Sequence, residues 1–237
     1  MVLEVLVLLA VVYLGGFLVR AFKKGIERGH QYLLTFSGAF LIGMVFLHLL
    51  PEIFHADSHG IGWWVLGGFM LQIILEYFSQ GIEHGHQHVH PGQSFPLMIY
   101  ISLCLHALIE TMPLGGVHDH GSFGDQLLIG LAVHKLPVSI VLATMLLKSG
   151  KKVGGMFIML TVFALMAPLG MFFYQFLESQ DIMAGHELFQ RTNALLVGIL
   201  LHISTTILFE SDDGHRFNLL KFLVIILGFA LSSIHFH

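Results

Sequence analysis

Eight long apolar stretches dominate this chain and leave little room for any other kind of structure. A helix needs about 20 mostly apolar residues to cross a bilayer. Windows of that length lie at 1-20, 32-54, 62-82, 96-116, 125-147, 153-177, 192-210 and 217-236. Hydrophobic residues make up 55% of the chain and charged residues 11%, whereas a soluble domain carries roughly 25% charged residues. The sequence therefore predicts an all-α integral membrane protein, a single transmembrane domain over 1-237 with eight transmembrane helices.

Basic residues lie almost entirely on one side of these windows. They follow windows one, five and seven at Arg20, Lys23, Lys24, Arg28, Lys148, Lys151, Lys152, Arg216 and Lys221. Arg191 falls on the other side. Because basic loops stay in the cytoplasm, we expect both termini to be extracytoplasmic, in a cell or inner membrane.

The number of windows on each side of the central pair suggests an internal repeat. The first three and the last three windows flank a central pair, and an odd number of spans on each flank gives the flanks opposite orientations. This arrangement is expected of inverted three-helix repeats around a central helix pair.

The orientation also predicts that the segment after window three lies in the cytoplasm, where it could sense or accept metal or be an inert polar loop. Its histidines are His84, His86, His88 and His90.

The central windows carry ionisable residues at a depth where charge is costly. His106 and Glu110 are four residues apart in window four, so they share one helix face. Window five contributes His134 and Lys135, two residues before Pro137. Ionisable groups inside a membrane usually serve a function, and imidazole with carboxylate suits Zn²⁺, Fe²⁺ or Mn²⁺. We expect His106, Glu110 and His134 to bind such a metal, with Lys135 paired to Glu110 and tuning the site.

Three further residues are candidate ligands. His48 and Glu52 repeat the four-residue spacing in window two, and His202 lies in the middle of window seven. Each could instead hydrogen-bond between helices and simply hold the bundle together, and Glu52 could be solvated at the outer interface. We keep all three as candidate metal ligands.

Prolines accompany both central clusters. Pro113 follows Glu110, and Pro137 follows His134. Each removes a backbone hydrogen bond and tends to kink its helix. Binding sites of membrane transporters are often built where helices are broken at mid-membrane, although a proline can also mark a kink that binds nothing.

Several functions are compatible with these residues. The first is inward transport of a divalent metal by alternating access. A haem-bearing electron carrier could use His106, His134 or His202 as axial ligands, and a metal sensor could have descended from a carrier. An intramembrane metalloenzyme is disfavoured because no His-Glu-x-x-His pair occurs. We expect a divalent metal ion and the lipid bilayer as partners, no nucleic acid and no permanent cofactor.

The central motifs resemble those of the ZIP family of divalent-metal transporters. His106-x-x-x-Glu110 is similar to the fourth-span pattern of that family, and His134-Lys135-Leu-Pro137 is similar to its fifth-span pattern. The eight windows, the topology and the His-rich segment agree with it over essentially the whole chain. The resemblance implies a helical bundle with spans four and five at its heart, metal uptake into the cytoplasm, and often a homodimer.

The chain departs from the family pattern at four positions. Ala107 replaces a polar residue, and Val138 and Ala167 stand where many or two-metal members carry carboxylates. Lys135 occupies a metal-ligand position of those members. The resemblance therefore implies a single-metal site whose second position is filled by the ammonium of Lys135.

Overall fold

The computed structural model describes residues 1–55, 60–82, 96–116, 122–181, 185–210 and 218–234, and these residues form helices without any strand. The α-helices are α1 (Val2–Ala21), α2 (Lys23–Met44), α3 (Leu50–His55), α4 (Ile61–Ser79), α5 (Leu97–Thr111), α6 (Ser122–Lys148), α7 (Val153–Ser179), α8 (Gly185–Glu210) and α9 (Leu219–Ser232). A π-helix, η1 (Val45–Leu49), joins α2 to α3, and a 3₁₀-helix, η3 (Met112–Gly116), follows α5. The predicted all-α fold is confirmed.

Seven helical segments of the described chain are long and apolar enough to cross a membrane. The eighth predicted span corresponds to α9, which has 14 residues. At 1.5 Å per residue it is roughly 21 Å long, shorter than the hydrocarbon core of about 30 Å. The helix that carries the second span also begins earlier than expected, since α2 starts at Lys23 instead of residue 32. The part of it that is apolar enough to cross a membrane begins at Gly29.

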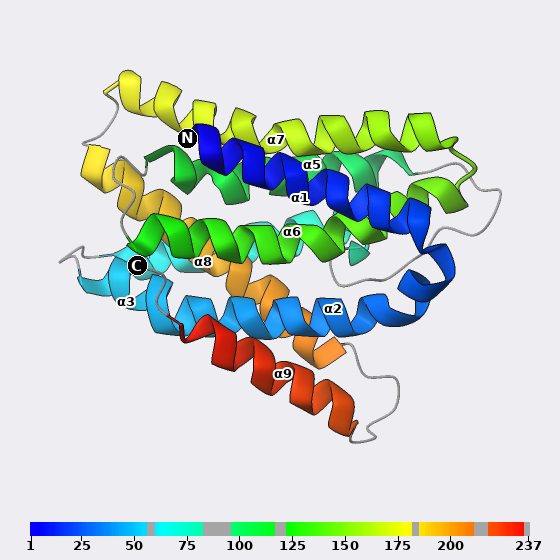
Figure 1. The fold of residues 1–237 in the computed structure, drawn as a ribbon. Helices are drawn as coiled ribbons and strands as arrows, with labels where there is room; N and C mark the ends of the chain where they lie inside the picture. Colours follow the sequence, from blue (N-terminus) through cyan, green and yellow to red (C-terminus); the bar gives the residue numbers. More distant parts are fainter. Residues whose placement is uncertain (56–59, 83–95, 117–121, 182–184, 211–217, 235–237) are drawn as a thin grey trace.

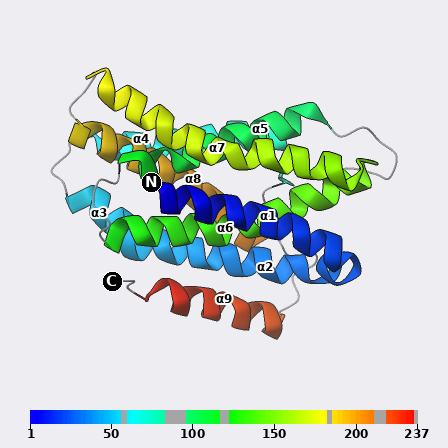
Figure 2. The same ribbon diagram turned by 45° about the horizontal axis from the view of Figure 1, so that its top comes forward.

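The helices form a bundle in which α6 lies near the middle (Figures 1 and 2). Helices α1, α2 and α7 contact α6, while α5 packs on α7 and α4 packs on α8. At the edge of the bundle, α9 packs on α2. The start of α1 and the end of α9 lie at the same end of the bundle (Figure 1).

The contacts between helices come in matched pairs. The packing of α1 on α6 corresponds to that of α7 on α5, and the packing of α4 on α8 corresponds to that of α9 on α2. An inverted repeat that exchanges the first three spans with the last three would produce both correspondences. The repeat symmetry itself stays a prediction.

Two prolines explain where the regular helices change form. Pro51 has no N–H to bond the carbonyl of Leu47, and the π-helix η1 ends just before it, with the Leu50 N–H bonded to the Val45 carbonyl. In the same way α5 stops at Thr111, two residues before Pro113, and continues as the 3₁₀-helix η3. By contrast, Pro137 and Pro168 lie inside α6 and α7.

Glycines allow α7 and α1 to approach the central helices α5 and α6 closely. A Cβ at Gly170 of α7 would collide with the backbone carbonyl of Leu108 in α5. A Cβ at Gly15 of α1 would collide with the side chain of Ser139 in α6. Because small residues let helix backbones approach closely in membranes, these contacts set the positions of α5 and α6, the helices that carry the central motifs.

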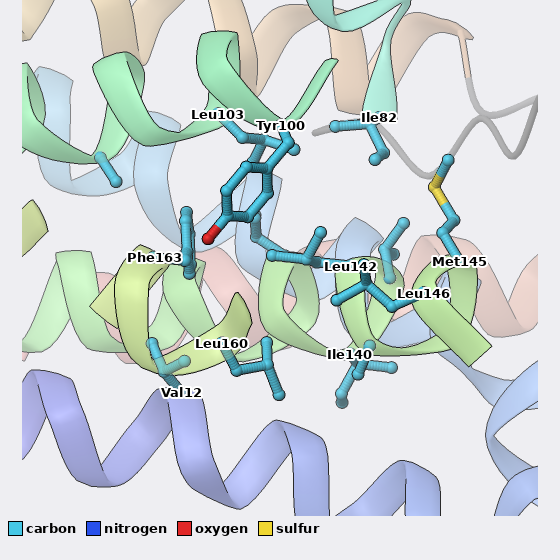
Figure 3. Packing of buried hydrophobic residues seen from close by; sticks show 14 of the residues in the cluster. Val12, Ile82, Tyr100, Leu103, Ile140, Leu142, Met145, Leu146, Leu160 and Phe163 are labelled. Carbon is cyan, nitrogen blue, oxygen red and sulfur yellow. The ribbon is translucent and has the colours of Figure 1, made fainter. Parts of the chain in front are cut away.

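A buried apolar cluster extends along the same helices (Figure 3). Tyr100 of α5 lies near Phe163 of α7, and the Tyr100 hydroxyl donates to the Met159 carbonyl at 2.6 Å. Leu142 and Leu146 of α6 belong to the same cluster. Packing of this kind holds α5, α6 and α7 together along their length.

Candidate metal centre

His106 and Glu110 occupy one face of α5, as their spacing predicts. Nε2 of His106 lies 3.1 Å from Oε2 of Glu110, and both side chains are buried. A neutral imidazole nitrogen with a lone pair and a carboxylate oxygen repel each other at that distance unless a proton or a cation lies between them. The pair is therefore suited to holding a positive charge.

His134 of α6 joins this pair from the opposite side. The rings of His106 and His134 lie edge to face, with centroids 5.9 Å apart and planes inclined at 80°. Each of His106, Glu110 and His134 offers one ligand atom, and the three atoms lie within 4.8 Å of one another. The expected convergence of two imidazoles and one acid from the two central helices is present in the structure.

Lys135 approaches the same carboxylate from another direction. Its ammonium forms an ion pair with Oε1 of Glu110, and both side chains are only 1% exposed. The ammonium also lies 5.5 Å from the centre of the Phe163 ring, where a cation is attracted to the aromatic face. The pairing suggested by the sequence is confirmed, and the two oxygens of Glu110 face different partners, Lys135 and His106.

Gln72 of α4 contacts the central group, although sequence analysis did not name it among the candidate site residues. The Nδ1 atom of His106 donates to Oε1 of Gln72 at 3.0 Å, and Gln72 is fully buried. A hydrogen bond at Nδ1 leaves the lone pair of a neutral imidazole on Nε2, the atom that faces Glu110. In the sequence, Gln72 is a polar amide in the middle of the apolar window 62-82, and this feature could have identified it as a candidate site residue.

The positions of the missing carboxylates are apolar and buried. Val138 and Ala167 both belong to the hydrophobic core, and the Ala167 carbonyl accepts a hydrogen bond from the Thr111 hydroxyl at 3.2 Å. Among the described residues, the group of three ligand-bearing side chains contains a single carboxylate, that of Glu110.

His48 and Glu52 lie in a different environment. Nε2 of His48 donates to the Ser232 carbonyl at 2.8 Å, at the C-terminal end of α9, where helix carbonyls lack intrahelical partners. The side chain of Glu52 is exposed. Neither residue belongs to the group formed by His106, Glu110 and His134, so their role as ligands stays a prediction.

His202 pairs with another acid. Its Nδ1 lies 3.2 Å from Oε2 of Glu76, with side-chain exposures of 12% and 21%. Its ring also packs edge-on against Phe69, with centroids 4.9 Å apart. Glu76 lies one turn after Gln72 on α4, so one face of this helix contacts both His202 and His106. His84, His86, His88 and His90 lie outside the described residues.

The central group has the dimensions of a site that closes around a small cation. A tetrahedral zinc ion with bonds of about 2.0–2.2 Å keeps its ligand atoms roughly 3.3–3.5 Å apart. The distance of 3.1 Å between His106 and Glu110 is close to this value. The ligand atom of His134 lies within 4.8 Å of the other two.

Comparison with known proteins identifies the family. A model of the ZIP zinc transporter family matches residues 80–235. Zinc transporter ZIP1 of Danio rerio is 27% identical over 153 residues, which cover 64% of this chain and 50% of that protein. Zinc transporter SLC39A7 of Rattus norvegicus is 30% identical over 79 residues, covering 25% of this chain and 17% of the relative. The chain thus spans half or less of the length of these relatives.

The family match includes α5 and α6, the helices that carry the central group. It agrees with the seven apolar helices that are long enough to cross a bilayer. Since the family model matches more than half of the chain, this integral membrane protein belongs to the ZIP zinc transporter family.

Proposed function

We propose that this chain transports a divalent metal ion, above all Zn²⁺, across the membrane through a single site formed by His106, Glu110 and His134. The observation that carries the proposal is the convergence of these three buried side chains, from two membrane helices, to within 4.8 Å. Groups that cost this much to bury are retained in membranes where they bind or move a charge.

The ligand chemistry favours a transition metal. Two imidazoles and one carboxylate suit Zn²⁺, Fe²⁺ and Mn²⁺, whereas Mg²⁺ and Ca²⁺ prefer oxygen ligands. Zinc is named in both relatives described above, Zinc transporter ZIP1 and Zinc transporter SLC39A7. Zn²⁺ is therefore the first substrate to test, with Fe²⁺ and Mn²⁺ as competitors.

Charge balance sets the strength of binding. Glu110 and Lys135 cancel each other, so a bound divalent ion leaves the buried site with a net charge of about +2. Such a site binds weakly and releases its ion quickly, which suits a carrier. Lys135 thus takes the place of a second metal and keeps the affinity for the transported ion low.

The orientation of the protein in the membrane follows from its basic residues. The α1–α2 and α6–α7 turns lie at one end of the bundle (Figure 1), and Arg20, Lys148, Lys151 and Lys152 are at or beside these turns. We assign this end to the cytoplasm by the positive-inside rule, with both termini outside. Inward uptake is the direction that the family resemblance implies. Homodimer formation stays a prediction.

Uptake of radioactive zinc into proteoliposomes tests the proposal. The intact protein should exceed empty vesicles, and His106→Ala and Glu110→Gln should abolish the difference. The control is His186→Ala, because His186 is an exposed histidine at the start of α8. His48→Ala, Glu52→Gln and His202→Ala show whether those residues add further binding positions. Zinc binding without flux would favour the sensor, and a Soret band in the purified protein would favour the haem carrier.

A further inference from the structure

A cavity of about 340 Å³ lies between α4, α5, α7 and α8. Its walls include Leu71 of α4, Ile109 of α5, Leu177 of α7 and Leu195 of α8. This volume falls within the range of about 300–1,000 Å³ that small-molecule sites occupy.

The walls are apolar apart from two residues of α8, Arg191 and Thr192. The Thr192 hydroxyl donates to the carbonyls of Leu188 and Phe189, so it is already satisfied within its own helix. An apolar cavity offers water too few partners and stays dry. The body of a ligand that fills it must therefore be hydrocarbon.

The polar end of the cavity is built from Arg191 and Trp64. The guanidinium of Arg191 lies 5.3 Å from the centre of a Trp64 ring, and it forms an ion pair with Glu187. The Arg191 side chain is 34% exposed. Since a guanidinium has five N–H donors in a planar fork, its pairing with one carboxylate leaves donors for a second anion.

The order of these residues along their helices matches the order of layers in a membrane. Arg191 and Trp64 lie in the first two turns of α8 and α4, about 9 Å and 4.5 Å along each helix from its first residue. Tryptophan and arginine are typical of the headgroup level. Leu71 and Leu195 lie deeper along the same helices, so the cavity runs from the interface towards the membrane centre.

We propose that this cavity binds a phospholipid of the surrounding bilayer, with one acyl chain between α4, α5, α7 and α8 and its phosphate on Arg191. The chain fits the apolar walls, and the phosphate matches the donors of Arg191. Each buried CH₂ contributes about 0.8 kcal/mol, and the phosphate adds charge-assisted hydrogen bonds.

The bound lipid is positioned to act on the metal centre, a step that rests on the proposed function. Ile109 directly precedes Glu110, and Leu71 directly precedes Gln72, the residue that orients His106. An acyl chain packed on Ile109 and Leu71 supports α5 and α4 where Glu110 and Gln72 meet His106. Lipid binding should therefore strengthen zinc binding at the central site.

Native mass spectrometry in the absence of metal tests the lipid site separately from transport. The protein is purified in detergent and titrated with phosphatidylglycerol or phosphatidylethanolamine, and Arg191→Gln, Thr192→Phe and Arg20→Gln are compared. Arg20 is an exposed arginine at the end of α1 and serves as the control. One tightly retained phospholipid is expected, and Arg191→Gln should weaken it at least about tenfold through loss of charge-assisted hydrogen bonds.

Thr192→Phe fills the cavity and should prevent retention while Arg20→Gln leaves it unchanged. The lipid site would be overturned if Arg191→Gln and Thr192→Phe retained phospholipid as tightly as the unsubstituted protein. It would also be overturned if Arg20→Gln lost as much phospholipid as these two variants. Retention of an uncharged alkyl detergent as tightly as of phospholipid would overturn the role of Arg191. A lipid site that persists in a protein without zinc flux would count against the proposed function alone.

Discussion

Lys135 and Glu110 form a fully buried ion pair between α6 and α5, and this pair uses one oxygen of the carboxylate while the other faces His106. The carboxylate is thus shared between a permanent cation and the candidate ligand group. A metal ion that bound to His106 and His134, as proposed, would compete with an ammonium that is already in place. The strength of metal binding depends on this competition, and the structure makes it testable.

Replacing Lys135 by Met removes the charge with little change in volume. We expect zinc affinity to rise by about tenfold or more, because Glu110 then balances the metal alone. Without metal, the variant should lose about 3–5 kcal/mol of stability, since Glu110 is left buried without its partner. Zinc titration calorimetry and thermal unfolding measure the two effects. Lys148→Met, at the end of α6, is the control, and weaker zinc binding in Lys135→Met would contradict the argument.

Gln72 should control zinc affinity without being a ligand. Gln72→Leu removes the acceptor that orients His106, and loss of such a partner typically costs 10–100-fold in metal affinity. Gln72→Glu keeps an acceptor at the same position and should retain binding. Equilibrium dialysis with radioactive zinc gives both affinities, and unchanged binding in Gln72→Leu would remove Gln72 from the site.

The close packing of α7 on α5 should be sensitive to a single methyl group. Gly170→Ala places a Cβ against the Leu108 carbonyl, so we expect a loss of about 1–3 kcal/mol of stability from overpacking together with reduced zinc uptake. Gly154 lies in the same helix with open space around it. Gly154→Ala should be neutral or stabilising by up to about 1 kcal/mol. Equal thermal stability of the two variants would refute the packing argument.

The orientation can be read from cysteine labelling. Cys104 is the single cysteine of the chain, so Cys104→Ala provides a background for new cysteines. Gln180→Cys, at the end of α7, should react with a membrane-impermeant thiol reagent added to intact cells. Lys151→Cys, at the opposite end, should react only after the membrane is opened. The reverse pattern would invert the assignment of both termini.

Local features of this protein could be predicted from the sequence alone. Hydropathy identified seven of the eight predicted spans, because a bilayer selects for long apolar segments whatever they pack against. The four-residue spacing of His106 and Glu110 placed them on one face of α5, since helix geometry is local. By contrast, the early start of α2 at Lys23 was missed because polar and basic residues can extend a helix beyond its apolar window.

Contacts between helices were decided by tertiary structure. Sequence spacing does not predict which residue lies opposite His106, because that depends on how α4, α5 and α6 approach one another. Close approaches at Gly170 and Gly15 position α5 and α6, and the close approach of Gly68 to the Leu195 carbonyl places α4 on α8. In this packing Gln72 and His134 lie beside His106. The same packing paired His202 with Glu76 and turned His48 to α9. The sequence by itself determined the helices and the residue types, and packing between distant segments decided which of those residues meet.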